Sequence, residues 1–70
     1  MGYYENIRTM KQELQELIHQ NKGKTISISS LSLSYGMRYG FGKRVVENAL
    51  KDFKEVGQIV LYKDSFEVVK

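Results

Sequence analysis

The 70-residue chain contains no cysteine and only one histidine. Without cysteine it can form neither a disulfide nor a thiolate metal site. His19 has no histidine partner and no evident cluster of other ligands, so we expect no structural zinc ion and no cofactor. The absence of cysteine fits an intracellular protein.

No hydrophobic run approaches the roughly 20 residues that cross a bilayer, and the start MGYYEN lacks the pattern of a signal peptide. We therefore expect a cytoplasmic protein with no membrane partner. Catalytic motifs are missing too, because there is no nucleophile–base pair, phosphate-binding glycine loop or metal cluster. His19 is better explained as a surface or capping residue, and we predict that the protein is not an enzyme.

Acidic residues are absent from the middle of the chain, between Glu16 and Glu47. The formal net charge is only +3, yet five basic residues fall in that stretch: Lys22, Lys24, Arg38, Lys43 and Arg44. Positive potential is therefore concentrated in one segment. Such segregation favours nucleic acid as a partner.

Hydrophobic periodicity predicts a single small α+β domain over residues 1–70. Its expected elements, in order, are a helix over 3–20, a short strand over 25–28, helices over 29–39 and 42–56, and a β-hairpin over 58–69. Ser29 or Ser30 is expected to cap the second helix. A domain of this size buries only about 60% of its unfolded surface, so homodimerisation is one way to add buried area.

Gly36, Gly40 and Val46 have the spacing of a helix-turn-helix motif. Gly36 is expected where two helices cross closely. Gly40 is expected where the chain leaves a helix at positive φ, a conformation that favours glycine. Val46 should face the core from the following helix, together with Ala49 and Leu50.

Around this motif the sequence resembles the winged helix-turn-helix superfamily of DNA-binding domains over nearly its whole length. The matching residues run from Tyr35-Gly36 through Tyr39-Gly40-Phe41-Gly42 to Val46 and Ala49-Leu50, followed by Phe53, Gly57-Gln58-Ile59 and the hairpin. The resemblance implies that helix 42–56 enters the DNA major groove, that the hairpin is the wing, and that strand 25–28 pairs with it. The chain departs from the family at Gly42, where serine or threonine is preferred.

The resemblance places five side chains of helix 42–56 nearest the groove: Lys43, Arg44, Glu47, Asn48 and Lys51. Arginine can bond guanine and asparagine can bond adenine, so Arg44 and Asn48 are the main base-reading candidates. Glu47 can accept from cytosine or orient a neighbouring cation. The alternative for this face is an ordinary solvated helix surface.

Six further residues suit contacts with DNA phosphates: Lys22, Lys24, Ser29, Ser30, Arg38 and Lys63. Four to six such contacts predict that log affinity falls with log salt at a slope of about −4 to −5. Tyr35, Tyr39 and Phe41 surround the turn, and core packing explains them better than base stacking. Tyr3 and Tyr4 can either seal the core or contact a second copy.

Leu33 and Met37 form an i, i+4 pair away from the Tyr35-Gly36-Tyr39 face. Packing on the first helix is the default interpretation, and an exposed patch would instead indicate a dimer or protein partner. The sequence therefore allows a homodimer through helix 3–20 or through this pair.

The main functional prediction is a small sequence-specific transcriptional regulator that binds double-stranded DNA as a dimer and is associated with the nucleoid when bound. The alternative is a winged-helix module that binds protein or RNA in a larger assembly. A nonspecific architectural DNA protein fits less well, because such proteins carry a larger positive excess.

Overall fold

The computed structural model describes residues 2–69, which form three helices and one small antiparallel sheet. In chain order the elements are α1 (Tyr3–Gln20), β1 (Thr25–Ser27), α2 (Ile28–Tyr39), α3 (Lys43–Glu55), β2 (Ile59–Leu61) and β3 (Ser65–Val68). The predicted α+β class and the predicted order of elements are confirmed. The side chain of Tyr3 lies outside the described part of the chain.

The sheet has the order β1-β3-β2, so the last strand lies in its centre. Phe66 of β3 is opposite Ile26 of β1 and Leu61 of β2, and its side chain is completely buried. The expected pairing of the short strand with the hairpin is therefore present. The hairpin turn is closed by the Tyr62 N–H, which donates to the Ser65 carbonyl at 2.8 Å.

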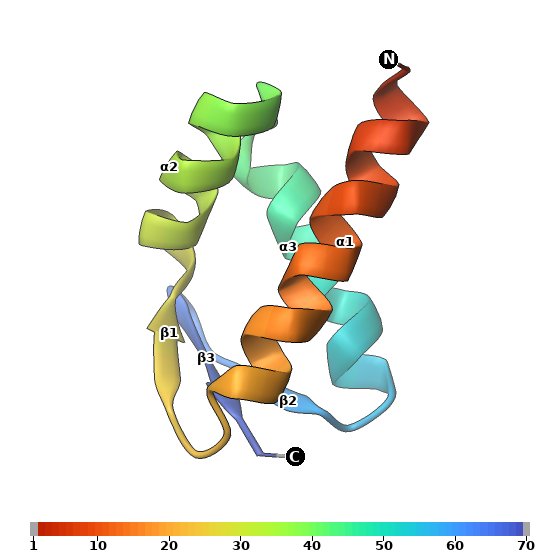
Figure 1. The fold of residues 1–70 in the computed structure, drawn as a ribbon. Coiled ribbons are helices and arrows are strands. Elements are labelled where there is room, and N and C mark those ends of the chain that lie inside the picture. Colours follow the sequence, from red (N-terminus) through yellow and green to blue (C-terminus); the bar gives the residue numbers. More distant parts are fainter. Residues whose placement is uncertain (1, 70) are drawn as a thin grey trace.

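The helices enclose the core on one side of the sheet, and α1 runs across α3 in the view of Figure 1. Met10, Leu14 and Ile18 recur every four residues along α1 and are buried, as the periodicity predicts. They meet the buried residues of the other elements: Ile28, Leu31, Tyr35, Phe41, Val46, Ala49, Leu50, Ile59, Phe66 and Val68. No helix within residues 2–69 combines the length and the apolar character needed to span a membrane.

The boundary between β1 and α2 differs from the prediction. Ile28, predicted as the end of the strand, is the first residue of α2 and is buried in the core. The cap is Ser27, whose Oγ accepts from the Ser30 N–H at 3.3 Å, rather than Ser29 or Ser30. The β-branched side chain of Ile28 favours a strand locally, but Ile28 is placed in α2 by its packing in the core and by the Ser27 cap that begins the helix.

The two glycines of the turn have different roles. Gly40 ends α2 at φ 76°, as expected, and its N–H donates to the Gly36 carbonyl at 2.9 Å. A Cβ on Gly36 would lie 3.1 Å from the Phe41 carbonyl oxygen. The close approach at Gly36 is therefore to the turn that follows α2, and not to a crossing helix as predicted.

Leu33 and Met37 are exposed, with 68% and 81% of their surface accessible. The prediction that they pack on α1 is wrong, because α2 turns Leu31 and Tyr35 toward the core and leaves the opposite face outside. Ser32 also points inward, and its Oγ is buried with no hydrogen-bond partner among the described residues.

Replacing Leu33 and Met37 together with serine is expected to change the free energy of unfolding by less than about 1 kcal/mol, because exposed side chains lose little packing. Leu50→Ser is the matched control, since Leu50 is completely buried. That control is expected to cost at least about 2–5 kcal/mol. Chemical denaturation measures both, and a loss in the double variant as large as in Leu50→Ser would contradict the exposed placement.

Candidate nucleic-acid interface

Helix α3 divides into a buried face and an exposed face, as its sequence pattern predicts. Val46, Ala49 and Leu50 lie in the core. Arg44 and Lys51 are exposed on the other side. They are seven residues, or about two turns, apart and therefore lie on the same face of the helix. Gly42 precedes the helix with no side-chain cap, as expected from the absence of a hydroxyl there.

A hollow of about 220 Å³ lies between this exposed face and the hairpin. Its lining unites four of the five predicted base-reading residues with parts of the hairpin and of α2: Arg44, Glu47, Asn48, Lys51, Leu61, Tyr62 and Ile28. Glu47 is half-buried, whereas Arg44, Asn48 and Lys51 are exposed. The fold therefore brings polar groups from α3 beside one edge of the sheet.

Tyr62 is a member of this group that the sequence did not single out. Its ring is half-exposed and its hydroxyl donates to Glu67 Oε1 at 3.1 Å. This hydrogen bond raises the pKa of Tyr62. The alternation of the hairpin was the available signal, since it places Tyr62 and Val60 on the same side, away from Leu61.

Lys43, the fifth predicted base-reading residue, is bound to the hairpin. Its Nζ lies 2.8 Å from Oδ1 of Asp64, and the Ser29 hydroxyl lies 3.5 Å from the same oxygen. The Lys43 ammonium lowers the pKa of Asp64, while the carboxylate raises the pKa of Lys43. The Asp64 carbonyl also accepts from the Ile28 N–H at 2.8 Å, so the turn is attached to α2 through its backbone.

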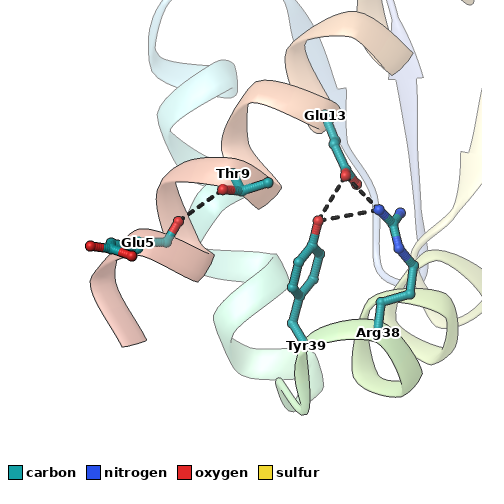
Figure 2. Close-up of polar contacts among 5 residues, drawn as sticks. All are labelled: Glu5, Thr9, Glu13, Arg38 and Tyr39. Atoms are coloured by element: carbon teal, nitrogen blue, oxygen red, sulfur yellow. Dashed lines mark hydrogen bonds and ion pairs between the residues drawn. The ribbon is translucent and has the colours of Figure 1, made fainter. Parts of the chain in front are cut away.

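Arg38, predicted to contact phosphate, belongs to a cluster between α1 and α2 (Figure 2). Its guanidinium donates to Glu13 Oε1, which also accepts from the Tyr39 hydroxyl at 2.7 Å. The bond from Arg38 lowers the pKa of Glu13. Arg38 also lies over the Tyr39 ring, 5.1 Å from its centroid. Its charge therefore already has a partner within the chain.

The aromatic residues of the turn pack as the sequence predicts. Tyr35 and Phe41 are buried, and Tyr39 is packed against the core. The rings of Tyr39 and Phe41 are stacked with centroids 5.6 Å apart. These rings are therefore used in the fold and are not presented for stacking on bases.

The other predicted phosphate residues are divided between the two ends of the sheet. Lys63 lies in the β2–β3 turn. Lys22 and Lys24 lie at the opposite end, where the Lys24 carbonyl accepts from the Val68 N–H at 2.9 Å. Ser30 is exposed near the start of α2. Ser29 and Lys63 directly follow Ile28 and Tyr62, which line the hollow beside α3.

The cations on α3 and in the hairpin turn differ in whether they form an ion pair within the chain. Within residues 2–69, Arg44, Lys51 and Lys63 form no ion pair, in contrast with Lys43. These three side chains can approach a polyanion without first losing a carboxylate partner. Lys43 would first have to leave Asp64.

Elsewhere on the described surface, a hollow of about 430 Å³ follows the second half of α1. It is lined largely by glutamine side chains and holds none of the predicted site residues. Residues 2–69 contain no group of three side chains suited to a metal ion. No family model, curated protein or solved structure matches this chain.

Proposed function

We propose that this protein is a winged-helix domain that binds double-stranded DNA, with α3 as the recognition helix and the β2–β3 hairpin as the wing. The observation that carries the proposal is the hollow beside α3, where Arg44, Asn48 and Lys51 are exposed next to the hairpin. Its biological role is that of a small sequence-specific transcriptional regulator.

The chemistry of these side chains suits the edges of base pairs. The major groove is about 12 Å wide and admits one helix. Arg44 can donate two hydrogen bonds to O6 and N7 of guanine, and Asn48 can bond N6 and N7 of adenine. Glu47 is half-buried beside them and is suited to hold Arg44 or Lys51 in position.

The arrangement of cations revises the expected dependence on salt. Arg44, Lys51 and Lys63 lie without ion-pair partners at the α3–hairpin surface, while Arg38 and Lys43 are paired with carboxylates. On a random-sequence duplex, where Arg44 has no selected guanine to bind, these three cations can each neutralise a phosphate, and about 0.9 for each gives a slope of about −3 in log affinity against log salt. This is shallower than the slope of about −4 to −5 that the sequence suggests.

The test is a fluorescence titration of a random-sequence DNA duplex, repeated at several salt concentrations and with single-stranded DNA and RNA of equal length. We expect the duplex to bind most tightly and its affinity to fall with a slope of about −3. Absence of duplex binding at micromolar protein and low salt would refute the proposal. Selection of preferred sites from a random library then tests sequence specificity.

The second candidate function is a protein-interaction module, and the exposure of Leu33 and Met37 favours it. Both lie on the outer face of α2, which carries no charged residue before Arg38. An exposed apolar pair of this kind is typical of a contact surface. Sedimentation of the wild type and of the Leu33→Ser/Met37→Ser variant tests whether it joins two copies, with a lower mass of the variant as the supporting result.

A further inference from the structure

The carboxylate of Asp64, in the β2–β3 turn, lies between polar groups from α3 and α2. It is bound by an ammonium from α3 and lies near a hydroxyl from α2, and these are the kinds of donor that hold a phosphate oxygen. Both donors, Lys43 and Ser29, are residues for which the sequence predicts DNA contacts. The fold brings them together around an anion of the chain itself.

We propose that Asp64 is an intramolecular competitor for the DNA phosphate that Lys43 contacts, and that it lowers the affinity of the protein for duplex. This inference rests on the proposed DNA-binding function. The Asp64 side chain is 67% exposed and that of Lys43 is 45% exposed, so both can separate without disturbing the core. The ligand class is a phosphodiester of the duplex backbone.

Competition follows from the charges at this corner of the molecule. An ammonium that is already neutralised releases no counterion from DNA, so it adds little to binding. A phosphate approaching Lys43 also meets the negative charge of Asp64 and is repelled. Lys63, the neighbour of Asp64 in the turn, offsets part of this repulsion but leaves the Asp64 carboxylate on the ammonium of Lys43.

Asp64→Asn removes the charge and keeps the shape and the hydrogen-bond acceptor. We expect duplex affinity at about 50 mM salt to rise about three- to tenfold, and the salt slope to become steeper by about 1, because one more phosphate contact releases its counterion. Titration of the random-sequence duplex at several salt concentrations measures both quantities.

Asp52→Asn is the matched control. Asp52 forms an ion pair with Lys11 at 2.9 Å and is 66% exposed, nearly the same as Asp64, but it joins α3 to α1. Both substitutions raise the formal net charge from +3 to +4. We expect Asp52→Asn to raise duplex affinity less than about twofold. An equal gain in the two variants would mean that the change in net charge alone explains the effect of Asp64→Asn, and it would overturn the inference.

A double substitution tests whether Asp64 acts through Lys43. In a Lys43→Gln background, Asp64→Asn should raise affinity by less than half of its effect in the wild type, since no ammonium remains to be released. A full gain in that background would also overturn the inference. If the wild type binds duplex with the expected salt dependence while Asp64→Asn has no effect, this inference fails and the proposed function stands. If the wild type does not bind duplex, the function itself fails.

Thermal unfolding of Asp64→Asn separates binding from folding. The backbone bond from the Ile28 N–H to the residue 64 carbonyl does not depend on the side chain, so we expect the hairpin to keep its place. Unchanged melting with raised affinity supports the inference. A loss of melting temperature comparable to that of a core substitution would show that Asp64 is required for the fold and would overturn its assignment as a competitor.

Discussion

Phe66→Ala is expected to remove a large part of the stability of this protein. The Phe66 side chain is completely buried in the central strand of the sheet. Truncating such a phenylalanine costs about 3–5 kcal/mol, because transfer energy is lost and a cavity remains. A 70-residue domain has a total stability of about 4–10 kcal/mol, so the substitution should remove between about a third of that total and all of it.

Thermal and chemical unfolding followed by circular dichroism measure the effect. We expect the melting temperature of Phe66→Ala to fall by about 15–30 °C, if a folded baseline remains at all. Val60→Ala is the control from the neighbouring strand, where Val60 is 41% exposed. It should cost less than about 1 kcal/mol. Similar losses in both variants would contradict the placement of Phe66 at the centre of the core.

Arg44→Ala is expected to weaken binding to a selected DNA site by roughly 10- to 100-fold, the cost of losing a bidentate contact with a base. Arg44 is exposed beside the hairpin and has no carboxylate to leave behind, so the substitution removes a ligand contact without breaking the fold. Its effect on a random duplex should be smaller, since only electrostatic attraction is lost there.

Arg8→Ala is the matched control, because it removes the same kind of side chain and the same charge from the exposed surface of α1. We expect Arg8→Ala to weaken the selected site and the random duplex equally and by less than about threefold. Equal behaviour of Arg44→Ala and Arg8→Ala would exclude Arg44 from base recognition. Competition between selected and random duplexes at one salt concentration distinguishes the two outcomes.

Several features of the fold could be predicted because they depend on local chemistry. Met10, Leu14 and Ile18 repeat every four residues, which already defines the buried face of α1. Gly40 has the positive φ that its position required. Alternation on either side of Lys63 and Asp64 was sufficient to predict the hairpin, since period-two burial and a polar turn leave few other structures.

Other features could not be predicted because they depend on residues far apart in the sequence. Ile28 has a strand-forming side chain, but its packing in the core makes it the first residue of α2. Leu33 and Met37 had an apolar pattern that fits burial, yet neither α1 nor the sheet covers that side of α2. Helical periodicity identifies a face, and only packing decides which face is covered.

The sequence by itself determined the order of elements, the division of α3 into a core face and a polar face, and the segment where positive charge collects. Only the tertiary structure decided which of those charges are free. Arg38 and Lys43 look alike in the sequence, but one meets Glu13 and the other meets Asp64. Each pair spans more than twenty residues of chain. An ion pair requires two side chains to lie close together in space. A pattern of neighbouring residues does not indicate which distant residues will be close.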